Sequence, residues 1–334
     1  MKTKSVFACI NTNLKVRLNS SSGGVFSLLA EHVIKNNGVV YGVKMSDDCY
    51  SAEYERVTDI DNLDLLRRSK YLQAKIGDTY NSVKSDLLNG RFVLFSGTGC
   101  QINGLCSFLE KEYKNLILVD VVCYGVPSSL LWKKYAKHQE KKYGGKLVAV
   151  NFRCKEKLNW SKYGLKEEFK INNEKRKIIF SNANVDSYMQ MFLRGMCLRP
   201  CCYNCTAKIK QLADITIADF WGVDKVIDNF NDEIGTSLIL LRTNKGIKIF
   251  NSLSNKKKSI EVTYEEAVKN NYSEYKSAEK PYQRDFFYED LLQMDYKDLS
   301  KKYIIKQRFS LKEKFKKKLK KILRLLIKLL HKIY

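Results

Sequence analysis

Apolar and polar positions along the chain follow two alternating periods, one typical of amphipathic helices and one typical of buried strands. Residues 25–33 carry apolar side chains at helical spacing, and Gly38 ends this predicted helix. A second helical pattern occupies 101–113. Short apolar runs typical of buried strands lie at 39–45, 91–97, 115–125, 214–222 and 237–243. The order strand, Gly turn, helix, strand predicts an α/β fold with a mixed, largely parallel sheet flanked by helices.

Several segments interrupt or follow this order. Residues 61–90 have a helical pattern with a break near residue 70, and alternating runs within 147–182 predict an antiparallel insertion. Helix-like polar segments then extend to about residue 300. We therefore predict one folded unit over 1–300, which includes the insertion, and a separate tail over 301–334.

The tail has a helical pattern of its own. Residues 301–334 carry 14 Lys or Arg side chains and one acidic side chain, Glu313. Apolar side chains recur at three- and four-residue steps, at Phe315, Leu319, Ile322, Leu323, Leu326, Ile327, Leu330 and Ile333. A cationic amphipathic C-terminal helix is typical of an anchor on an anionic membrane surface. Packing on a protein is the main alternative, and we expect no nucleic acid because the stripe lacks stacking aromatics.

Composition narrows the class of protein. The chain has 334 residues, a formal net charge of +24, 44% hydrophobic residues, three His and ten Cys. The apolar fraction excludes wholesale disorder, and three His exclude a His-rich metal site. The sequence has no visible signal peptide and no run of about 18 uncharged apolar residues. We therefore expect a cytoplasmic protein whose cysteines are reduced and serve metal binding or redox chemistry rather than disulfides.

Four cysteines stand where ligands collect. Cys100 and Cys123 each follow the C-terminal end of a predicted buried strand, where open α/β sheets bind ligands. Cys202 and Cys205 form a C-x-x-C, whose spacing lets two thiolates face one metal centre. Four thiolates suit a 4Fe–4S cluster or a structural zinc, and unligated thiols are a third interpretation. A local zinc set would instead use Cys197, Cys201, Cys202 and Cys205. Spacing alone does not separate these alternatives.

Three polar segments are candidate cofactor sites. Ser20, Ser21, Ser22, Gly23 and Gly24 precede a predicted helix, so hydroxyl and backbone N–H groups could bind an anion there, or simply cap the helix. Ser69, Lys70 and Tyr71 place a hydroxyl, a cation and an aromatic ring together, as an ordinary surface helix also could. Asp219 ends a strand before two aromatics and a Gly, which suits a cofactor pocket or a core turn equally.

The ordered set of motifs resembles the coenzyme F420 hydrogenase/dehydrogenase beta-subunit family. The stretches that carry the resemblance follow one another in the family's order over residues 20–225. They are SSSGGVFSLLA (20–30), RRSKYLQAKIGDTY (67–80), FVLFSGTGCQINGL (92–105), LVDVVCYGVPSS (118–129), LRPCCYNCTAK (198–208) and ADITIADFWGV (213–223).

The resemblance implies a flavoprotein with an iron–sulfur cluster, an oxidoreductase that passes electrons between a 4Fe–4S cluster, FAD and an acceptor. Coenzyme F420 is a candidate hydride carrier. By resemblance, the cluster ligands are Cys100, Cys123, Cys202 and Cys205. The flavin-pocket residues implied in the same way are Ser21, Ser22, Gly23, Gly24, Ser69, Lys70, Tyr71, Thr98 and Asp219.

The sequence departs from the family's pattern in three places. Gly99 stands where the family usually has Pro, and Ala218 stands where it usually has Gly. The N-terminal C-x-x-C-x-x-C runs of many members are absent, so we expect a separate ferredoxin-like electron donor. Short members resemble proteins found beside surface-polysaccharide enzymes, which would fit a location at the inner face of the cell membrane. The alternative function is a non-catalytic, membrane-associated accessory protein of glycan assembly.

Overall fold

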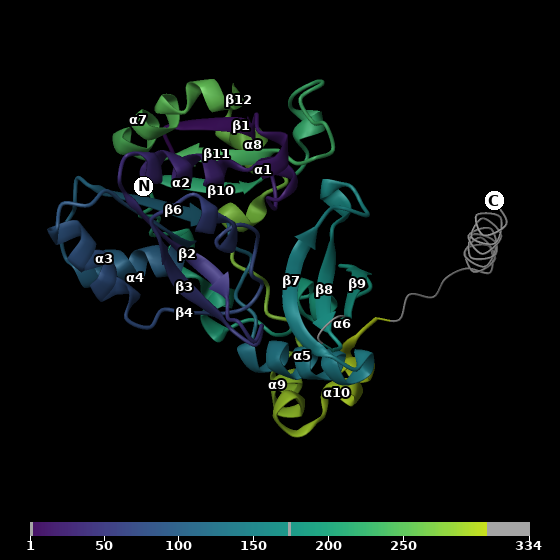
Figure 1. Ribbon diagram of the computed structural model, residues 1–334. Coiled ribbons are helices and arrows are strands. Elements are labelled where there is room, and N and C mark those ends of the chain that lie inside the picture. Colours follow the sequence, from purple (N-terminus) through teal and green to yellow (C-terminus); the bar gives the residue numbers. More distant parts are fainter. Residues whose placement is uncertain (1–2, 173–174, 306–334) are drawn as a thin grey trace, which may run out of the picture.

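The computed structural model describes residues 3–172 and 175–305, and within them the chain forms two separate sheets (Figure 1). The larger sheet has nine strands in the order β12-β1-β11-β10-β6-β5-β2-β3-β4. Its strands are β1 (Ser5–Asn11), β2 (Val39–Met45), β3 (Ala52–Val57), β4 (Ala74–Lys75), β5 (Val93–Thr98), β6 (Leu116–Val121), β10 (Ile215–Asp219), β11 (Ser237–Leu241) and β12 (Lys257–Val262).

The centre of this sheet is parallel and its flanks are mostly antiparallel. The neighbours β10–β6, β6–β5 and β5–β2 pair in parallel, and β11, β1 and β12 then add in antiparallel fashion. On the other flank β3 pairs antiparallel with β2. The predicted α/β class with a mixed sheet is confirmed. Its strand ends therefore meet at one edge in the centre, where parallel strands run the same way.

Two helical layers cover the central strands, which explains their continuous apolar runs. Val40 and Leu94 face the core formed with α2 (Val25–Lys35) and α7 (Asn244–Ser252). Tyr41 and Phe95, one residue further along the same strands, face the core formed with α3 (Thr79–Leu88) and α4 (Gly99–Leu109). Because both faces are buried, neither face is polar and no alternation remains in the sequence.

The predicted insertion forms the second sheet, in which three antiparallel strands pair in the order β7-β8-β9. These strands are β7 (Lys146–Cys154), β8 (Gly164–Lys170) and β9 (Arg176–Asn182). Figure 1 shows α5, α9 and α10 beside the base of this sheet. Trp132, Phe152, Tyr188 and Phe287 form the centre of their common core. The helices around the two sheets are completed by α1 (Leu14–Leu18), α5 (Ser129–Tyr143), α6 (Ser187–Leu193), α8 (Tyr264–Val268), α9 (Arg284–Gln293) and α10 (Tyr296–Tyr303).

The segment 61–90 differs from the prediction. Only a short 3₁₀ helix (Asp61–Leu65) and α3 are helical, and the residues between them form a loop with the two-residue strand β4. The loop is held by contacts with distant residues, such as the hydrogen bond from the Ser69 N–H to Ser21 Oγ at 2.9 Å. Contacts with residues distant in the sequence therefore override the local helical preference of this segment.

The C-terminal tail was predicted to be a membrane-surface helix. Its first residues, up to Tyr303, belong to α10, and residues 306–334 lie outside the described residues. In the described part of the chain, no helix combines the length and apolar character needed to cross a bilayer.

Two carboxyl groups share one hydroxyl in the core beneath the second sheet. The Tyr135 hydroxyl lies 3.1 Å from Glu167 Oε2 and 2.9 Å from Asp186 Oδ2, and the Gln139 amide donates to Glu167 Oε2 at 3.1 Å. No basic side chain in the described part of the chain forms an ion pair with either carboxyl. Burial, followed by the nearby Asp186, raises the pKa of Glu167 to about 8. Glu167 therefore keeps its proton in the folded protein at neutral pH.

Because folded Glu167 holds this proton, we predict that the free energy of unfolding falls as the pH rises. In the unfolded chain Glu167 loses its proton near pH 4.5, whereas the folded protein holds the proton until about pH 8. Its stabilising contribution is complete below about pH 4.5, and between the two values the free energy of unfolding falls by up to about 1.4 kcal/mol per pH unit. Urea denaturation at several pH values should show this slope in the wild type and a flatter one in Glu167→Gln. The exposed Glu261→Gln is the matched control, and equal slopes in all three proteins would contradict the assignment.

Candidate functional site

A cavity of about 590 Å³ lies at the C-terminal ends of the central parallel strands. Its walls come from the Ser/Gly loop before α2, the loop before β4, the ends of β5, β6 and β10, and the second sheet. Of the residues predicted for a flavin pocket, all except Gly23 line it, namely Ser21, Ser22, Gly24, Ser69, Lys70, Tyr71, Thr98 and Asp219. Cys100 and Cys123 line the same cavity. The structure therefore brings the residues implied for the flavin and two of the four predicted cysteine ligands to one cavity.

The serines of the Ser/Gly loop do not cap α2. The N-cap residue is Gly24, with φ of 82°, and no side chain accepts a hydrogen bond from the first turn. Ser21 Oγ instead lies 3.0 Å from Ser69 Oγ and accepts the Ser69 N–H, while Ser22 Oγ donates to the Thr236 carbonyl at 2.8 Å. Simple helix capping therefore does not explain this run of serines, and its hydroxyls join the cavity loops to one another.

Gly23 lies behind the cavity wall, where a side chain has no room. Its N–H donates to Ser237 Oγ at 3.0 Å. A Cβ atom at this position would lie 2.5 Å from the Cys9 carbonyl oxygen and 2.7 Å from the Ser237 nitrogen. The glycine lets the loop pack directly against β1 and β11, and this close approach fixes the position of Ser21 and Ser22 at the cavity surface.

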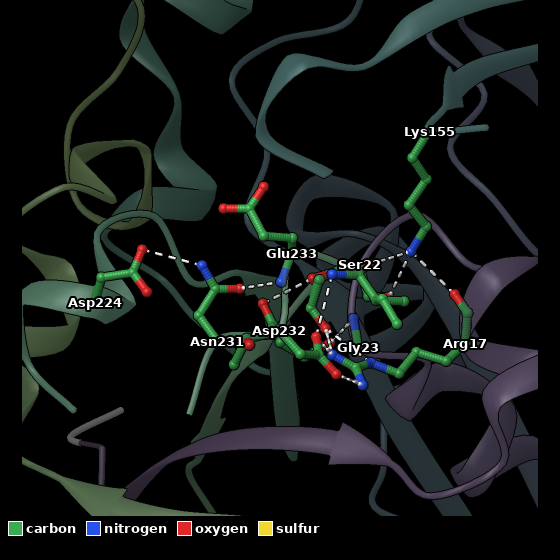
Figure 2. Close-up of polar contacts among 12 residues, drawn as sticks. Arg17, Ser22, Gly23, Lys155, Asp224, Asn231, Asp232 and Glu233 are labelled. Atoms are coloured by element: carbon green, nitrogen blue, oxygen red, sulfur yellow. Dashed lines mark hydrogen bonds and ion pairs between the residues drawn. The ribbon is translucent and has the colours of Figure 1, made fainter. Parts of the chain in front are cut away.

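Half-buried Lys155 bonds the Ser/Gly loop, and buried Arg17 bonds the neighbouring segment 232–235 (Figure 2). The Lys155 ammonium donates to the carbonyl oxygens of Arg17, Ser22 and Ile234, at 3.0, 3.3 and 2.5 Å. Arg17 forms a bidentate ion pair with Asp232. Burial, with smaller contributions from nearby arginines, lowers the pKa of Lys155 to about 8. Because Lys155 directly follows β7, this contact also ties the second sheet to the cavity wall.

Lys70 has a similar role in the neighbouring loop. Its ammonium donates to the carbonyl oxygens of Leu65 and Arg67, at 2.9 and 2.5 Å. Burial, assisted by Arg68, lowers the pKa of Lys70 to about 7. The predicted cation is thus present at the cavity, but its N–H groups are directed to the backbone of its own loop.

Arg153 is a cavity residue that sequence analysis missed. It is 4% exposed and forms a bidentate pair with Asp219, at 2.8 and 3.1 Å. Its guanidinium lies 3.9 Å from the centre of the Tyr163 ring, and the Trp160 indole N–H donates to Asp219 at 3.1 Å. An arginine within the apolar run of β7 was the available signal, because a charged residue is buried only with a partner. The pair joins the second sheet to the end of β10.

The four predicted cysteine ligands come from three segments that meet at one end of the cavity. Cys100 is the second residue of α4, Cys123 follows β6, and Cys202 and Cys205 lie in and directly after a 3₁₀ helix (Pro200–Asn204). Two contacts join the last two of these segments: the Val126 N–H donates to Cys202 Sγ at 3.3 Å, and Lys208 Nζ donates to the Cys123 carbonyl at 2.6 Å. The Asn103 amide on α4 donates to the Lys210 carbonyl at 2.7 Å and joins the segment of Cys100 to them.

The pKa of the half-buried Cys123 is affected by the other three cysteines. Burial raises the pKa of Cys123 to about 12; Lys208 opposes the rise, and Cys100, Cys202 and Cys205 add to it. In the described residues, however, no three His, Cys, Asp or Glu side chains lie close enough to hold one metal ion. A tetrahedral zinc site would need its sulfurs about 3.8 Å apart, because each Zn–S bond is about 2.3 Å. The four thiols are therefore neighbours without forming a single-ion site.

The alternative local set of Cys197, Cys201, Cys202 and Cys205 is not brought together. Cys197 is fully buried in the core below the second sheet, and burial raises its pKa to about 12 with no contribution from another cysteine. Cys202, by contrast, is affected by Cys100, Cys201 and Cys205. The remaining cysteines, Cys9, Cys49, Cys106 and Cys154, are buried or half-buried, as expected for ordinary core thiols.

Alanine substitutions at Gly23 and Gly99 test how closely the chain packs at the cavity. Replacing Gly23 by Ala should lower the free energy of unfolding by about 1–3 kcal/mol, because its Cβ would overlap backbone atoms. At Gly99 a Cβ would meet Ala207 Cβ and Asp120 Oδ2 at 3.2 Å, so Gly99→Ala should cost less. Urea denaturation measures both, with Ser22→Ala as a control expected to cost about 1 kcal/mol for one lost hydrogen bond. Equal stability of Gly23→Ala and wild type would contradict the packing described.

Comparison with known proteins gives two findings. The family model for the C terminus of the coenzyme F420 hydrogenase/dehydrogenase beta subunit matches residues 90–267. The structure is similar to a chain of the F420-reducing [NiFe] hydrogenase complex from Methanosarcina barkeri, studied by xenon derivatization, with a TM-score of 0.52 and 13% sequence identity. The similarity covers 78% of this chain and 82% of that chain, and at this identity it shows a shared fold. No curated protein matches the chain significantly.

Proposed function

The chain belongs to the coenzyme F420 hydrogenase/dehydrogenase beta-subunit family, and from this premise we propose that it is an iron–sulfur flavoprotein oxidoreductase. In this proposal a 4Fe–4S cluster is bound by Cys100, Cys123, Cys202 and Cys205, and FAD occupies the cavity. The observation that supports the proposal is that Cys100 and Cys123 line the same cavity as the residues implied for the flavin. Hydrogen bonds join the segment that carries Cys202 and Cys205 to the residues around Cys123.

The thiol arrangement favours a cluster over zinc. The thiols are neighbours, but no three of the candidate ligands come close enough for one ion in the described part of the chain. An iron–sulfur cluster spreads its four cysteine ligands around a core of several atoms, so it accepts thiols that are further apart. The donor set, four cysteines from three segments, has the number and type of ligands of a 4Fe–4S cluster.

The cavity has the charge and size expected for an anionic dinucleotide cofactor. Its lining includes four arginines and Lys70, against one acidic residue, Asp219. Arg153 is paired with Asp219, and Arg67 and Arg68 are paired with carboxylates outside the lining. In the described part of the chain, Lys70 and Arg199 are therefore the lining cations without an ion pair, and they supply the positive charge. The uncapped N-terminus of α2 adds free backbone N–H groups beside the Ser/Gly loop, which favours a phosphate there.

In this function the protein's residues hold the loops and the second sheet in place around the cofactor cavity. When bound, the cluster would supply one-electron transfer and the flavin two-electron transfer, for which coenzyme F420 is one candidate acceptor. Lys155 fixes the Ser/Gly loop, Arg17 fixes the neighbouring segment at Gly235, and Lys70 fixes the loop before β4. Arg153 holds the second sheet against Asp219, so that Tyr163, whose ring the guanidinium contacts, lines the cavity.

Metal analysis tests the cluster. Anaerobically purified wild-type protein should contain about four iron and four sulfide per chain and show a flavin spectrum. Cys202→Ser and Cys205→Ser should lose most of the iron, because each removes one thiolate. Cys197→Ser is the matched control, since Cys197 lies in the same segment but is buried away from the other thiols, and it should keep its iron. Wild-type protein without iron, sulfide and flavin would refute the proposed function.

The contact between Ser21 and Ser69 predicts that the Ser/Gly loop contributes to FAD affinity. Ser21→Ala removes the bridge to Ser69 and should weaken FAD binding about tenfold, or about 1.4 kcal/mol, because the two cavity loops lose their direct connection. Flavin fluorescence titration of the purified chain measures the dissociation constant. Ser46→Ala, which also removes a serine hydroxyl with two partners but lies outside the cavity lining, should bind FAD as the wild type does. Equal affinity of Ser21→Ala and wild type would contradict this role for the loop.

A further inference from the structure

Two surface segments next to Cys205 are joined by hydrogen bonds along their length. The segments are 205–211 and 272–277. Their three connecting bonds run from the Cys205 N–H to Ser277 Oγ, from Lys208 Nζ to the Ser273 carbonyl, and from the Gln211 amide to Glu274 Oε1. Lys208 also donates to the carbonyl oxygen of Cys123. The two segments therefore form one unit attached to the group of four thiols.

This unit carries large apolar side chains in contact with water. Ile209 is 84% exposed, Tyr272 is 56% exposed and Tyr275 is 55% exposed. We refer to these three residues as the Ile/Tyr patch. Their backbone is fixed by the bonds between the two segments, so exposure does not come from a loose chain end. An exposed apolar group on a fixed backbone is typical of a contact surface for another protein, and tyrosine is enriched in such surfaces.

The surroundings of the Ile/Tyr patch are basic. Lys210 directly follows Ile209, Lys269 lies three residues before Tyr272, and Arg199 lies one turn before Cys202, whose N–H donates to the Arg199 carbonyl at 2.9 Å. All three are exposed, and no carboxylate in the described part of the chain forms an ion pair with any of them. With a net charge of +24, two copies of this chain repel one another. The complementary partner is therefore an acidic protein.

We propose that the Ile/Tyr patch and its basic surroundings form the docking surface for an acidic one-electron carrier protein. This inference rests on the proposed function, since it has electrons enter the protein beside the four thiols. The thiols are accessible from this side: Cys201 and Cys100 are exposed, and Cys205 is half-buried. In the transfer step the reduced carrier loses one electron and the cluster gains it, with no bond formed or broken. Two such steps provide the two electrons that the flavin needs.

The experiment measures complex formation rather than turnover. The probe is a purified acidic [2Fe–2S] ferredoxin in its oxidised form, titrated into the full chain by isothermal calorimetry at low and at moderate ionic strength. Wild type should bind, and binding should weaken with added salt. Ile209→Ser combined with Tyr275→Ser, which leaves the cavity lining unchanged, should weaken binding at least tenfold, and Lys210→Glu should reduce both the affinity and its salt dependence.

Matched controls keep the test specific. Ile178→Ser on β9 and Leu88→Ser on α3 replace side chains that are 56% and 64% exposed outside the patch, and both should bind ferredoxin as the wild type does. Circular dichroism verifies that each variant is folded. Patch variants that bind as tightly as wild type, or a wild type that does not bind, would overturn the proposal, as would patch variants that change only self-association in ultracentrifugation. Iron and flavin content, measured on the same samples, reports separately on the proposed function.

Discussion

The parallel pairing of β5 with β6 is the constraint on which the candidate site depends. In its register Thr98 pairs with Val121, so Cys100 and Cys123 each stand two residues beyond the last paired positions. Two thiols from different parts of the sequence are thereby placed at the same edge of the sheet. A single further segment, 198–208, then supplies both Cys202 and Cys205 when it packs beside this edge. The hydrophobic burial of both faces of β5 and β6 fixes this register, because a slip of one residue would exchange their faces.

The loops around the cavity are fixed by lysines rather than by regular structure. Lys70, Lys155 and Lys208 each donate to carbonyl oxygens of the loops at the cavity, among them those of Arg67, Ser22 and Cys123. An ammonium group can donate hydrogen bonds to three carbonyl oxygens at once, so a single lysine side chain can hold several backbone segments together. Burial lowers the pKa of Lys70 and of Lys155, because removing an ammonium group from water disfavours its charged form. The positive charge that holds the loops also adds to the potential that attracts an anionic cofactor.

The sequence predicted the parts of the fold and site that local patterns encode. The central strands follow from apolar runs, and the cysteines after β5 and β6 follow from strand ends. Strands β1 and β12 were missed because their pairing joins residues about 250 positions apart, as in Phe7 with Glu261. Arg153 and Lys155 were missed for a related reason, since their partners lie on other elements. The ligand and flavin roles of individual residues stay predictions, to which the structure adds proximity.

The departure from the family pattern at Gly99 has a packing explanation. A side chain at this position would meet Ala207 Cβ and Asp120 Oδ2 at 3.2 Å, so the space that a larger residue needs is already filled. Asp120 is buried, its Oδ1 has no hydrogen-bond partner among the described residues, and burial raises its pKa to about 7. The glycine thus allows the segment after Cys205 to pack against the first turn of α4, which carries Cys100. The glycine at this position is therefore explained by local packing between two thiol-bearing segments.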